Sequence, residues 1–277
     1  MISGKTTLIA HLGYPTETFK APMIYNPWFE HAGIDAVVVP MGIKAEHYAA
    51  FVRELFTLSN LRGALVTMPH KMSTVALLDE ATPTVRVAGS CNAILRRADG
   101  ALVGDMFDGE GFVRGMRRKG RTVEGARALV VGSGGVGSAI AASLAAAGVG
   151  ELGLYDANGD TAAALAGRLA VHYPDLRVTT GSNDASGYDV VVNATPLGMN
   201  AGDPLPLDVS RIAPNAFVGE VVMKQETTPF LRAAVERGCA VQVGIDMLFE
   251  QIPAYLEFFG FPTTTAEELR RIAQVRY

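Results

Sequence analysis

Short runs of apolar residues alternate with segments of helical period along most of the chain. Short apolar runs are typical of strands, whereas apolar residues spaced three and four apart are typical of amphipathic helices. In the N-terminal part this pattern predicts strands at residues 6–12, 36–41, 64–68, 91–95 and 101–104, and helices at 22–32, 45–56 and 74–80. Pro22 suits the first turn of its helix, and Pro27 predicts a kink or a later start. An Asp-Gly pair at 99–100 predicts a hairpin, so this part is expected to be βαβα with a hairpin appended.

The rest of the chain alternates more regularly. Strands are predicted at residues 128–131, 151–155, 176–179, 189–193, 216–222 and 240–243, and helices at 109–118, 136–147, 161–172, 247–259 and 265–275. Strands that alternate with helices predict a doubly wound parallel sheet. Thr265 followed by Glu268 fits a capping box at the start of the last helix. We therefore expect an α/β protein whose helical tail docks back on its first domain.

A glycine-rich stretch follows the strand predicted at 128–131 and opens an Ala-rich helix. It runs Gly132, Ser133, Gly134, Gly135, Val136, Gly137 and has the form G-x-G-x-x-G. Such glycines permit a tight turn, close approach of the backbone to a pyrophosphate, and close packing of helix on strand. The free N–H groups of the helix N-terminus favour an anion there. This context predicts a dinucleotide site rather than a glycine-rich turn without a ligand.

The next strand ends at Asp156, which lies 19 residues after Gly137. That spacing is typical of the acidic residue that accepts hydrogen bonds from the ribose hydroxyls. A carboxylate there repels a 2′-phosphate, and none of residues 157–160 is basic. We therefore expect Asp156, with Ala157 and Asn158, to bind NAD in preference to NADP. Residues 193–196 follow another apolar strand and suit the ligand crevice at the carboxyl end of such a sheet, although an ordinary loop exit has the same appearance.

Composition narrows the functional classes. The 277 residues are 49% hydrophobic and 19% charged, with a formal net charge of −4, which predicts a globular protein without a chain-wide basic surface for nucleic acid or anionic lipid. The basic cluster at 117–121 is interpreted as a solvated linker face. No apolar run reaches the length of a membrane helix and no signal peptide is evident, so a cytoplasmic protein is expected. Two distant cysteines and five scattered histidines predict neither a disulfide framework nor a metal site.

Four further segments carry distinctive motifs, namely VTMPHK at 66–71, AGSCNAI at 88–94, GDMFDG at 104–109 and GIDMLFEQ at 244–251. In the same order, they resemble the motifs V-T-x-P-x-K, A-G-A-V-N-T-L, G-x-N-T-D-x-x-G and G-x-x-M-L-x-x-Q of the shikimate/quinate dehydrogenase family. With the glycine loop, the resemblance extends along nearly the whole chain. The resemblance implies a substrate domain at 1–108 and 245–277 and a Rossmann domain at 109–244.

The resemblance also implies residue roles. Lys71 and Asp108 are expected to be catalytic, because oxidation of a secondary alcohol needs a group that takes the hydroxyl proton. Isolated, such residues would be interpreted as surface charges, and only the motif context favours catalysis. The other residues that the resemblance assigns are Thr67, Asn92 and Gln251 for substrate, and Asn193, Ala194, Thr195, Pro196, Val221, Met223, Gly244, Met247 and Leu248 for cofactor.

Several polar positions of the family are apolar here. The family's first loop, G-N-P-x-x-x-S-x-S-P, usually supplies two hydroxyls to the substrate carboxylate, but Phe19 and Ala21 occupy those positions. Leu65 replaces an Asn, residues 106–107 are Met-Phe in place of Asn-Thr, and Met223 replaces a Tyr. Each lost hydrogen bond to a charged group costs roughly 1.5–3 kcal/mol. Lys20 or Thr18 is the candidate for a rebuilt carboxylate site; otherwise the substrate is less polar on that side.

The sequence thus predicts an NAD-preferring oxidoreductase, a monomer or homodimer, that acts on a small hydroxylated ring such as shikimate, quinate or a related compound. One alternative is a dehydrogenase of the same fold for another hydroxylated or aminated ring. A second is an NAD-binding regulator with vestigial chemistry, which would not need a proton relay.

Overall fold

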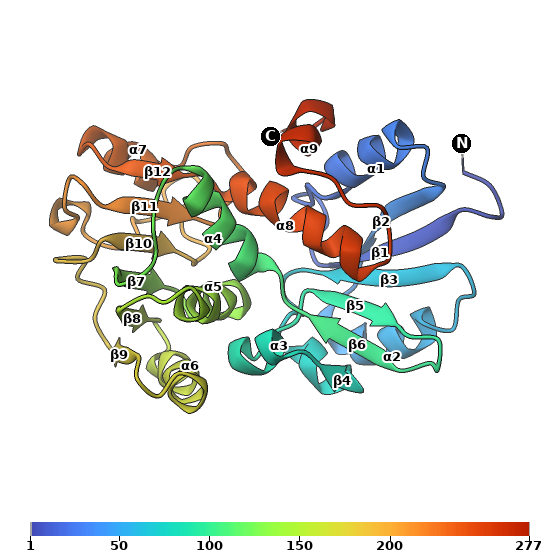
Figure 1. Cartoon of the computed structure of the whole chain (residues 1–277), viewed down its shortest axis with the longest axis horizontal. Helices are drawn as coiled ribbons and strands as arrows, with labels where there is room; N and C mark the ends of the chain where they lie inside the picture. Colours follow the sequence, from blue (N-terminus) through green and yellow to red (C-terminus); the bar gives the residue numbers. More distant parts are fainter. Residues whose placement is uncertain (1, 277) are drawn as a thin grey trace. The chain divides into compact units, whose positions relative to one another are not determined.

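The structure is a computed structural model that describes residues 2–276 (Figure 1). The chain divides into two compact units, each of which is described by itself. Unit 1 contains residues 2–86, 90–107 and 251–276, and unit 2 contains residues 87–89 and 108–250.

Unit 1 is built on a mixed six-stranded sheet of order β2-β1-β3-β5-β6-β4. Its strands are β1 (Thr7–Gly13), β2 (Ala36–Gly42), β3 (Leu61–Val66), β4 (Glu80–Ala81), β5 (Ala93–Arg96) and β6 (Leu102–Asp105). The first three strands are parallel, and β5 and β6 form the predicted hairpin. Strand β4 was not predicted, and its two residues are too few to show a pattern.

The helices of the N-terminal part are α1 (Pro22–His31), α2 (Ala45–Leu55) and α3 (Pro83–Ala88). Helix α1 begins at Pro22 and continues through Pro27, so the expected late start is wrong. Asn26 fastens α1 to the edge strand β2, because its amide donates to the carbonyl of Val38 and accepts from the N–H of Val38. The helix predicted at 74–80 is also wrong, since this segment is a single 3-10 turn, Ser73–Leu77, followed by β4.

Unit 2 confirms the doubly wound parallel sheet. Its order is β12-β11-β10-β7-β8-β9 and every pairing is parallel. The strands are β7 (Arg127–Val131), β8 (Glu151–Tyr155), β9 (Arg177–Thr180), β10 (Val190–Asn193), β11 (Phe217–Glu220) and β12 (Ala240–Gln242). Strand order reverses beside β7, the switch point at which such sheets bind ligands. The central strands are fully buried Val and Leu runs, as expected of a sheet covered on both faces.

The helices of unit 2 are α4 (Asp108–Arg118), α5 (Gly135–Ala146), α6 (Gly159–His172) and α7 (Pro229–Glu236), and α8 (Gly244–Phe258) begins here. The basic cluster is not simply a solvated linker. Arg118 forms ion pairs with Asp246 and Glu250, and Lys119 pairs with Asp246. The end of α4 is thereby tied to the first turns of α8, where acidic residues also favour the helix dipole.

Residues 251–276, which include the rest of α8, belong to unit 1. After α8, helix α9 (Ala266–Ile272) is capped by Thr265, whose hydroxyl accepts from the N–H of Glu268. In Figure 1 α9 lies beside α1, and the N–H of Gln274 donates to the carbonyl of Met23. Among residues 2–276 no helix is both long and apolar enough to cross a membrane.

Candidate active site

The glycine loop between β7 and α5 shows why three glycines are needed. Gly132 has φ +102°, and a Cβ there would lie 2.7 Å from the carbonyl carbon of Ala194. A Cβ on Gly137 would collide with the carbonyl oxygen of Gly132, so this glycine lets α5 pack closely on the loop. Gly134 differs, because a Cβ there would meet no heavy atom within 4 Å. Its half-exposed backbone borders open space, which is where a pyrophosphate would approach the helix N-terminus.

Asp156 completes this end of unit 2. Its carboxylate accepts hydrogen bonds from the N–H of Ser133 at 2.7 Å and from the N–H of Asn158 at 2.9 Å. Residues 157–160, which follow it, are exposed. The carboxylate is therefore fixed against the glycine loop at the rim of the sheet. The loop, the helix N-terminus and this acid together fit the adenosine half of a dinucleotide.

The loop after β10 is organised by Asn193. Its side-chain oxygen accepts from the N–H and the hydroxyl of Thr195, and its amide donates to the carbonyl of Leu197. The predicted residues Ala194, Thr195 and Pro196 thus form a compact turn at the carboxyl end of the sheet.

Glu220 lies beside Asn193 in the register of β10 and β11. Its side chain is fully buried, and one carboxyl oxygen accepts from the hydroxyl of Thr228 at 2.8 Å. Burial raises the pKa of Glu220 to about 7. This residue therefore joins the end of β11 to Thr228, the N-cap of α7.

The other predicted cofactor residues lie in the two segments that follow. Val221 and Met223 are half-buried directly after β11. Gly244 opens α8, and a Cβ there would collide with the carbonyl of Val222. Met247 and Leu248 are buried in the first turns of α8. Each of these five residues belongs to unit 2.

In unit 1, Lys71 is held on a well-supported loop. The Lys71 side chain is buried, and its carbonyl accepts from the N–H of Cys91 at 2.8 Å. The preceding His70 ring stacks on Tyr48 with centroids 3.9 Å apart, and His70 Nε2 donates to the carbonyl of Ile43 at 2.8 Å. These contacts fix the backbone that presents the Lys71 ammonium.

Asn92, directly before β5, and Gln251, on α8, both belong to unit 1. Asn92 Oδ1 accepts from the N–H of Phe107 at 3.0 Å, and its carbonyl accepts from the hydroxyl of Tyr255 at 3.2 Å. Gln251 lies one helical turn before Tyr255 on α8, so both side chains lie on the same face. Both amides are buried, and Asn92 Nδ2 and Gln251 Oε1 have no hydrogen-bond partner. Unpartnered buried polar atoms are costly unless a ligand or water satisfies them.

Asp108 is the first residue of α4 and directly follows Phe107. Its side chain is 2% exposed. A Cβ on the next residue, Gly109, would collide with the backbone of α5. The glycine therefore permits the N-terminus of α4 to pack closely against α5. Asp108 thus belongs to unit 2, whereas Lys71 belongs to unit 1.

The departures from the family pattern that lie in unit 1 are buried. Phe19, Ala21, Leu65, Met106 and Phe107 are each at most 9% exposed. Thr67 is half-buried and borders Phe19, because a Cβ on the intervening Gly13 would contact both side chains. The apolar replacements therefore face the interior of unit 1 rather than solvent.

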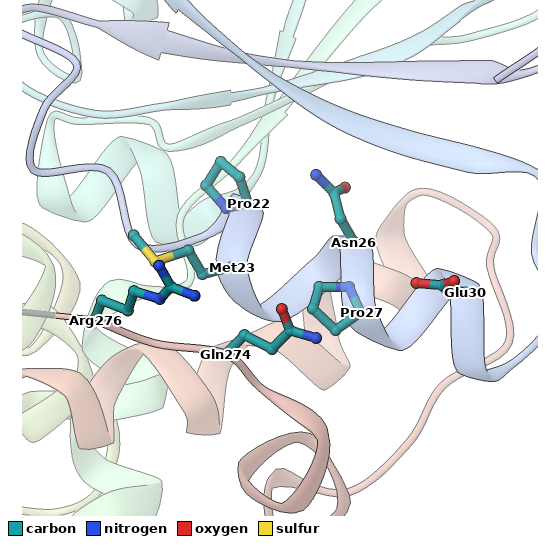
Figure 2. Close-up of a pocket in the computed structure, with 7 residues that line it drawn as sticks. All are labelled: Pro22, Met23, Asn26, Pro27, Glu30, Gln274 and Arg276. Carbon is teal, nitrogen blue, oxygen red and sulfur yellow. The ribbon is translucent and has the colours of Figure 1, made fainter. Parts of the chain in front are cut away.

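Lys20 is also buried, and its ammonium donates to the backbone carbonyl of Arg276. That carbonyl belongs to the C-terminal segment beside an open hollow, which Figure 2 shows lined by Pro22, Met23, Asn26, Pro27, Glu30, Gln274 and Arg276. None of the predicted substrate residues lines this hollow. A carboxylate site rebuilt on Lys20 would have to share the ammonium with the C-terminal segment.

Comparison with known proteins agrees with this geometry. Residues 12–94 match the shikimate dehydrogenase substrate binding domain, and residues 114–159, which include the glycine loop, match the ThiF family. A shikimate dehydrogenase (NADP(+)) of Rubrobacter xylanophilus is 37% identical over 254 residues, or 90% of this chain and 89% of that protein. The chain belongs to the shikimate dehydrogenase family. Its members are alcohol dehydrogenases that use a nicotinamide cofactor, which confirms the expected class of oxidoreductase.

Two solved structures of the family agree with the fold. Shikimate 5-dehydrogenase of Listeria monocytogenes, in complex with shikimate and NAD, has a TM-score of 0.86 and is 25% identical, covering 98% of this chain and 97% of its own. Quinate dehydrogenase of Corynebacterium glutamicum, in complex with NAD, has a TM-score of 0.85 and is 26% identical, covering 96% and 98%. The predicted α/β fold, with a substrate domain and a Rossmann-type domain, is confirmed.

Sequence reasoning missed one residue of this region. His11, on β1, is buried, and its ring packs on Phe19 with centroids 4.1 Å apart. The signal was a histidine inside a run of apolar strand residues, which was interpreted as strand pattern alone. Strand alternation does not distinguish a core histidine from one beside a ligand.

Proposed function

We propose that this member of the shikimate dehydrogenase family is an NAD-preferring dehydrogenase of a ring secondary alcohol, with shikimate, quinate or a related compound as substrate. The observation that carries the proposal is the buried Lys71, held on a fixed loop beside Asn92, together with two buried amide atoms that have no hydrogen-bond partner, Nδ2 of Asn92 and Oε1 of Gln251. Such an arrangement suits a small ligand with several hydroxyl groups.

We propose that unit 1 binds the alcohol and unit 2 binds the cofactor. When bound, NAD supplies the nicotinamide that accepts a hydride from the carbinol carbon. Residues 132–137, Asp156 and the loop at 193–196 would hold it. Lys71 and Asp108 would take the hydroxyl proton in oxidation and return it in reduction. Thr67, Asn92 and Gln251 would orient the ring by hydrogen bonds to its hydroxyls.

The preference for NAD rests on Asp156. Its carboxylate is fixed by two backbone N–H groups, and the exposed residues 157–160 add a second acid, Asp160, and no base. A 2′-phosphate placed there would meet like charge without a compensating cation. Since relatives of this chain are named NADP(+)-dependent, the test compares both cofactors.

The test is the initial rate of oxidation of shikimate and quinate, each with NAD and with NADP, followed by reduced-cofactor absorbance. We expect turnover, with a higher kcat/KM for NAD than for NADP. A higher kcat/KM for NADP would contradict the cofactor proposal. Oxidation of neither acid, with tight NAD binding, would favour a dehydrogenase for another hydroxylated or aminated ring. Binding of NAD with no turnover of any ring alcohol would favour a regulatory protein.

A further inference from the structure

Five buried polar atoms in the described part of unit 1 lack a hydrogen-bond partner. Two of them, the hydroxyl of Tyr25 and Nε1 of Trp28, lie on α1, and the other three are Nδ1 of His11, Nδ2 of Asn92 and Oε1 of Gln251. A buried donor or acceptor that stays unpaired is costly, so the last three, on or beside the proposed substrate residues, indicate a missing hydrogen-bonding partner. Asn92 and Gln251 are already proposed to bind substrate, and His11 is not.

Contacts connect His11 to this region. In the register of β1 and β3, His11 lies opposite Leu65, two residues before Thr67. Its ring packs on Phe19, which itself borders Thr67. The Lys71 ammonium is close enough to act on the His11 ring electrostatically. His11 therefore lies among the residues that the proposed function assigns to the substrate.

The His11 ring is uncharged at neutral pH. Burial, and secondarily the Lys71 ammonium, lower the pKa of His11 from 6.5 to about 3. A neutral imidazole has one nitrogen that donates and one that accepts. It therefore matches a hydroxyl, which also does both, and it offers no positive charge to a carboxylate.

The surroundings of His11 are apolar. Phe19, Ala21 and Leu65 are buried at the positions where the family pattern has hydroxyl and amide side chains. The ammonium of Lys20, between Phe19 and Ala21 in the chain, donates to the carbonyl of Arg276. A carboxylate placed against Phe19 would lose its hydration without gaining the hydrogen bonds that replace it.

We propose that His11 is a substrate-binding residue that, together with Phe19, forms a neutral subsite, so that the substrate is an uncharged polyhydroxylated alcohol or ketone rather than a carboxylic acid. This inference rests on the proposed function. It gives the partnerless atoms of His11, Asn92 and Gln251 one common ligand, in which hydroxyl groups accept from Asn92 Nδ2, donate to Gln251 Oε1 and pair with Nδ1 of His11.

The test compares shikimate with methyl shikimate, which has the same ring and hydroxyls but no charge. We expect the wild-type enzyme with NAD to oxidise the ester with a kcat/KM roughly 10- to 100-fold above that of the acid, because a buried carboxylate lacks about 1.5–3 kcal/mol for each charged hydrogen bond. An equal or higher kcat/KM for the acid would overturn the neutral subsite and leave the proposed function intact. Oxidation of neither compound, and of neither quinate nor its methyl ester, would overturn the proposed function, and with it this inference.

Two variants test whether residues 11, 19 and 21 cause the expected preference for the ester. The double variant Phe19→Ser, Ala21→Ser restores hydroxyls and should raise kcat/KM for shikimate about tenfold or more without improving the ester. His11→Phe keeps an aromatic ring but removes both nitrogens, and should raise KM for the ester about tenfold, with kcat and the dissociation constant of NAD little changed. An unchanged KM in His11→Phe, in a protein that retains its wild-type melting temperature, would overturn the role of His11.

Discussion

The two units encode function in different ways. In unit 2 the proposed cofactor site consists mostly of backbone. At Gly134 the absence of a side chain leaves the backbone open to a ligand. At Asp156 the backbone is held in place, because the carboxylate accepts hydrogen bonds from two N–H groups. In unit 1 the proposed substrate site consists of side chains from separate segments, among them His11, Lys71, Asn92 and Gln251. Backbone requirements leave few alternatives in sequence, because only glycine meets them. Side-chain requirements can be met by many residues, so specificity can change while the fold stays the same.

The first prediction separates the two units by removing the proposed proton-transfer group of unit 1, the Lys71 ammonium, without changing unit 2. Lys71→Met keeps the length of the side chain but removes the ammonium, so we expect kcat to fall about 10²–10⁴-fold, the range for loss of a general acid–base group. The dissociation constant of NAD, measured by fluorescence titration, should change little. Lys5→Met, at an exposed position, is the matched control. Loss of NAD binding together with kcat in Lys71→Met would mean that the two functions are not separate.

The second prediction distinguishes two glycines of the loop by their roles, Gly134 in cofactor binding and Gly137 in packing. Gly134→Ala places a methyl group in open space, so it should leave the melting temperature unchanged and weaken NAD binding about tenfold or more. Gly137→Ala forces a methyl group against the carbonyl of Gly132, so it should destabilise the protein by about 1–3 kcal/mol or more. Thermal unfolding and cofactor titration on both variants check this. Equal loss of stability in the two would contradict the distinction between a ligand glycine and a packing glycine.

The third prediction concerns Glu220 in unit 2. Because burial raises the pKa of Glu220 from its usual 4.5 to about 7, the protonated carboxyl is favoured in the folded state, and its stabilisation is lost as pH rises through about 7. We expect the free energy of unfolding of the wild type to fall, relative to Glu220→Gln, by at most about 3 kcal/mol between pH 4.5 and 7.5. Urea unfolding at several pH values measures this, and Glu226→Gln, at an exposed position, controls for loss of one carboxyl. A pH-independent difference would show that Glu220 is not buried as a neutral acid.

The smallest effect is expected at the rim of the cofactor site. Asp156→Ser with Ala157→Arg removes the repulsion of a 2′-phosphate and adds a cation, so the ratio of kcat/KM for NAD to that for NADP should fall about tenfold. Asp160→Ser removes the same charge four residues further along the chain, in the first turn of α6, and should leave the ratio nearly unchanged. A preference for NADP already present in the wild type, and unaffected by Asp156, would contradict our interpretation of this residue.

The sequence predicted the regular features of the fold and the backbone of the cofactor loop. The parallel sheet of unit 2, the hairpin and the cap at Thr265 all depend on local patterns and are confirmed. The helix expected at 74–80 is wrong because its apolar spacing belongs to a 3-10 turn whose residue Thr74 is bonded to Tyr48. The ion pairs of Arg118 with α8 could not be predicted, because they join residues more than a hundred positions apart.

The proposed site residues also divide into those that sequence motifs identify and those that only the three-dimensional contacts reveal. Motif order was enough to single out Lys71, Asn92 and Gln251, whereas their partnerless atoms and the packing of His11 on Phe19 are visible only in three dimensions.

The most direct test of the account follows a label from the alcohol to the cofactor. Shikimate and methyl shikimate carrying deuterium at the reacting carbinol carbon are mixed with enzyme and NAD, and the reduced nicotinamide is analysed by mass spectrometry. The account predicts deuterium in the reduced cofactor for the wild type and for Lys5→Met, and almost none for Lys71→Met at equal NAD occupancy. NAD bound by the wild type without label transfer from either compound, or transfer that is undiminished in Lys71→Met, would contradict it.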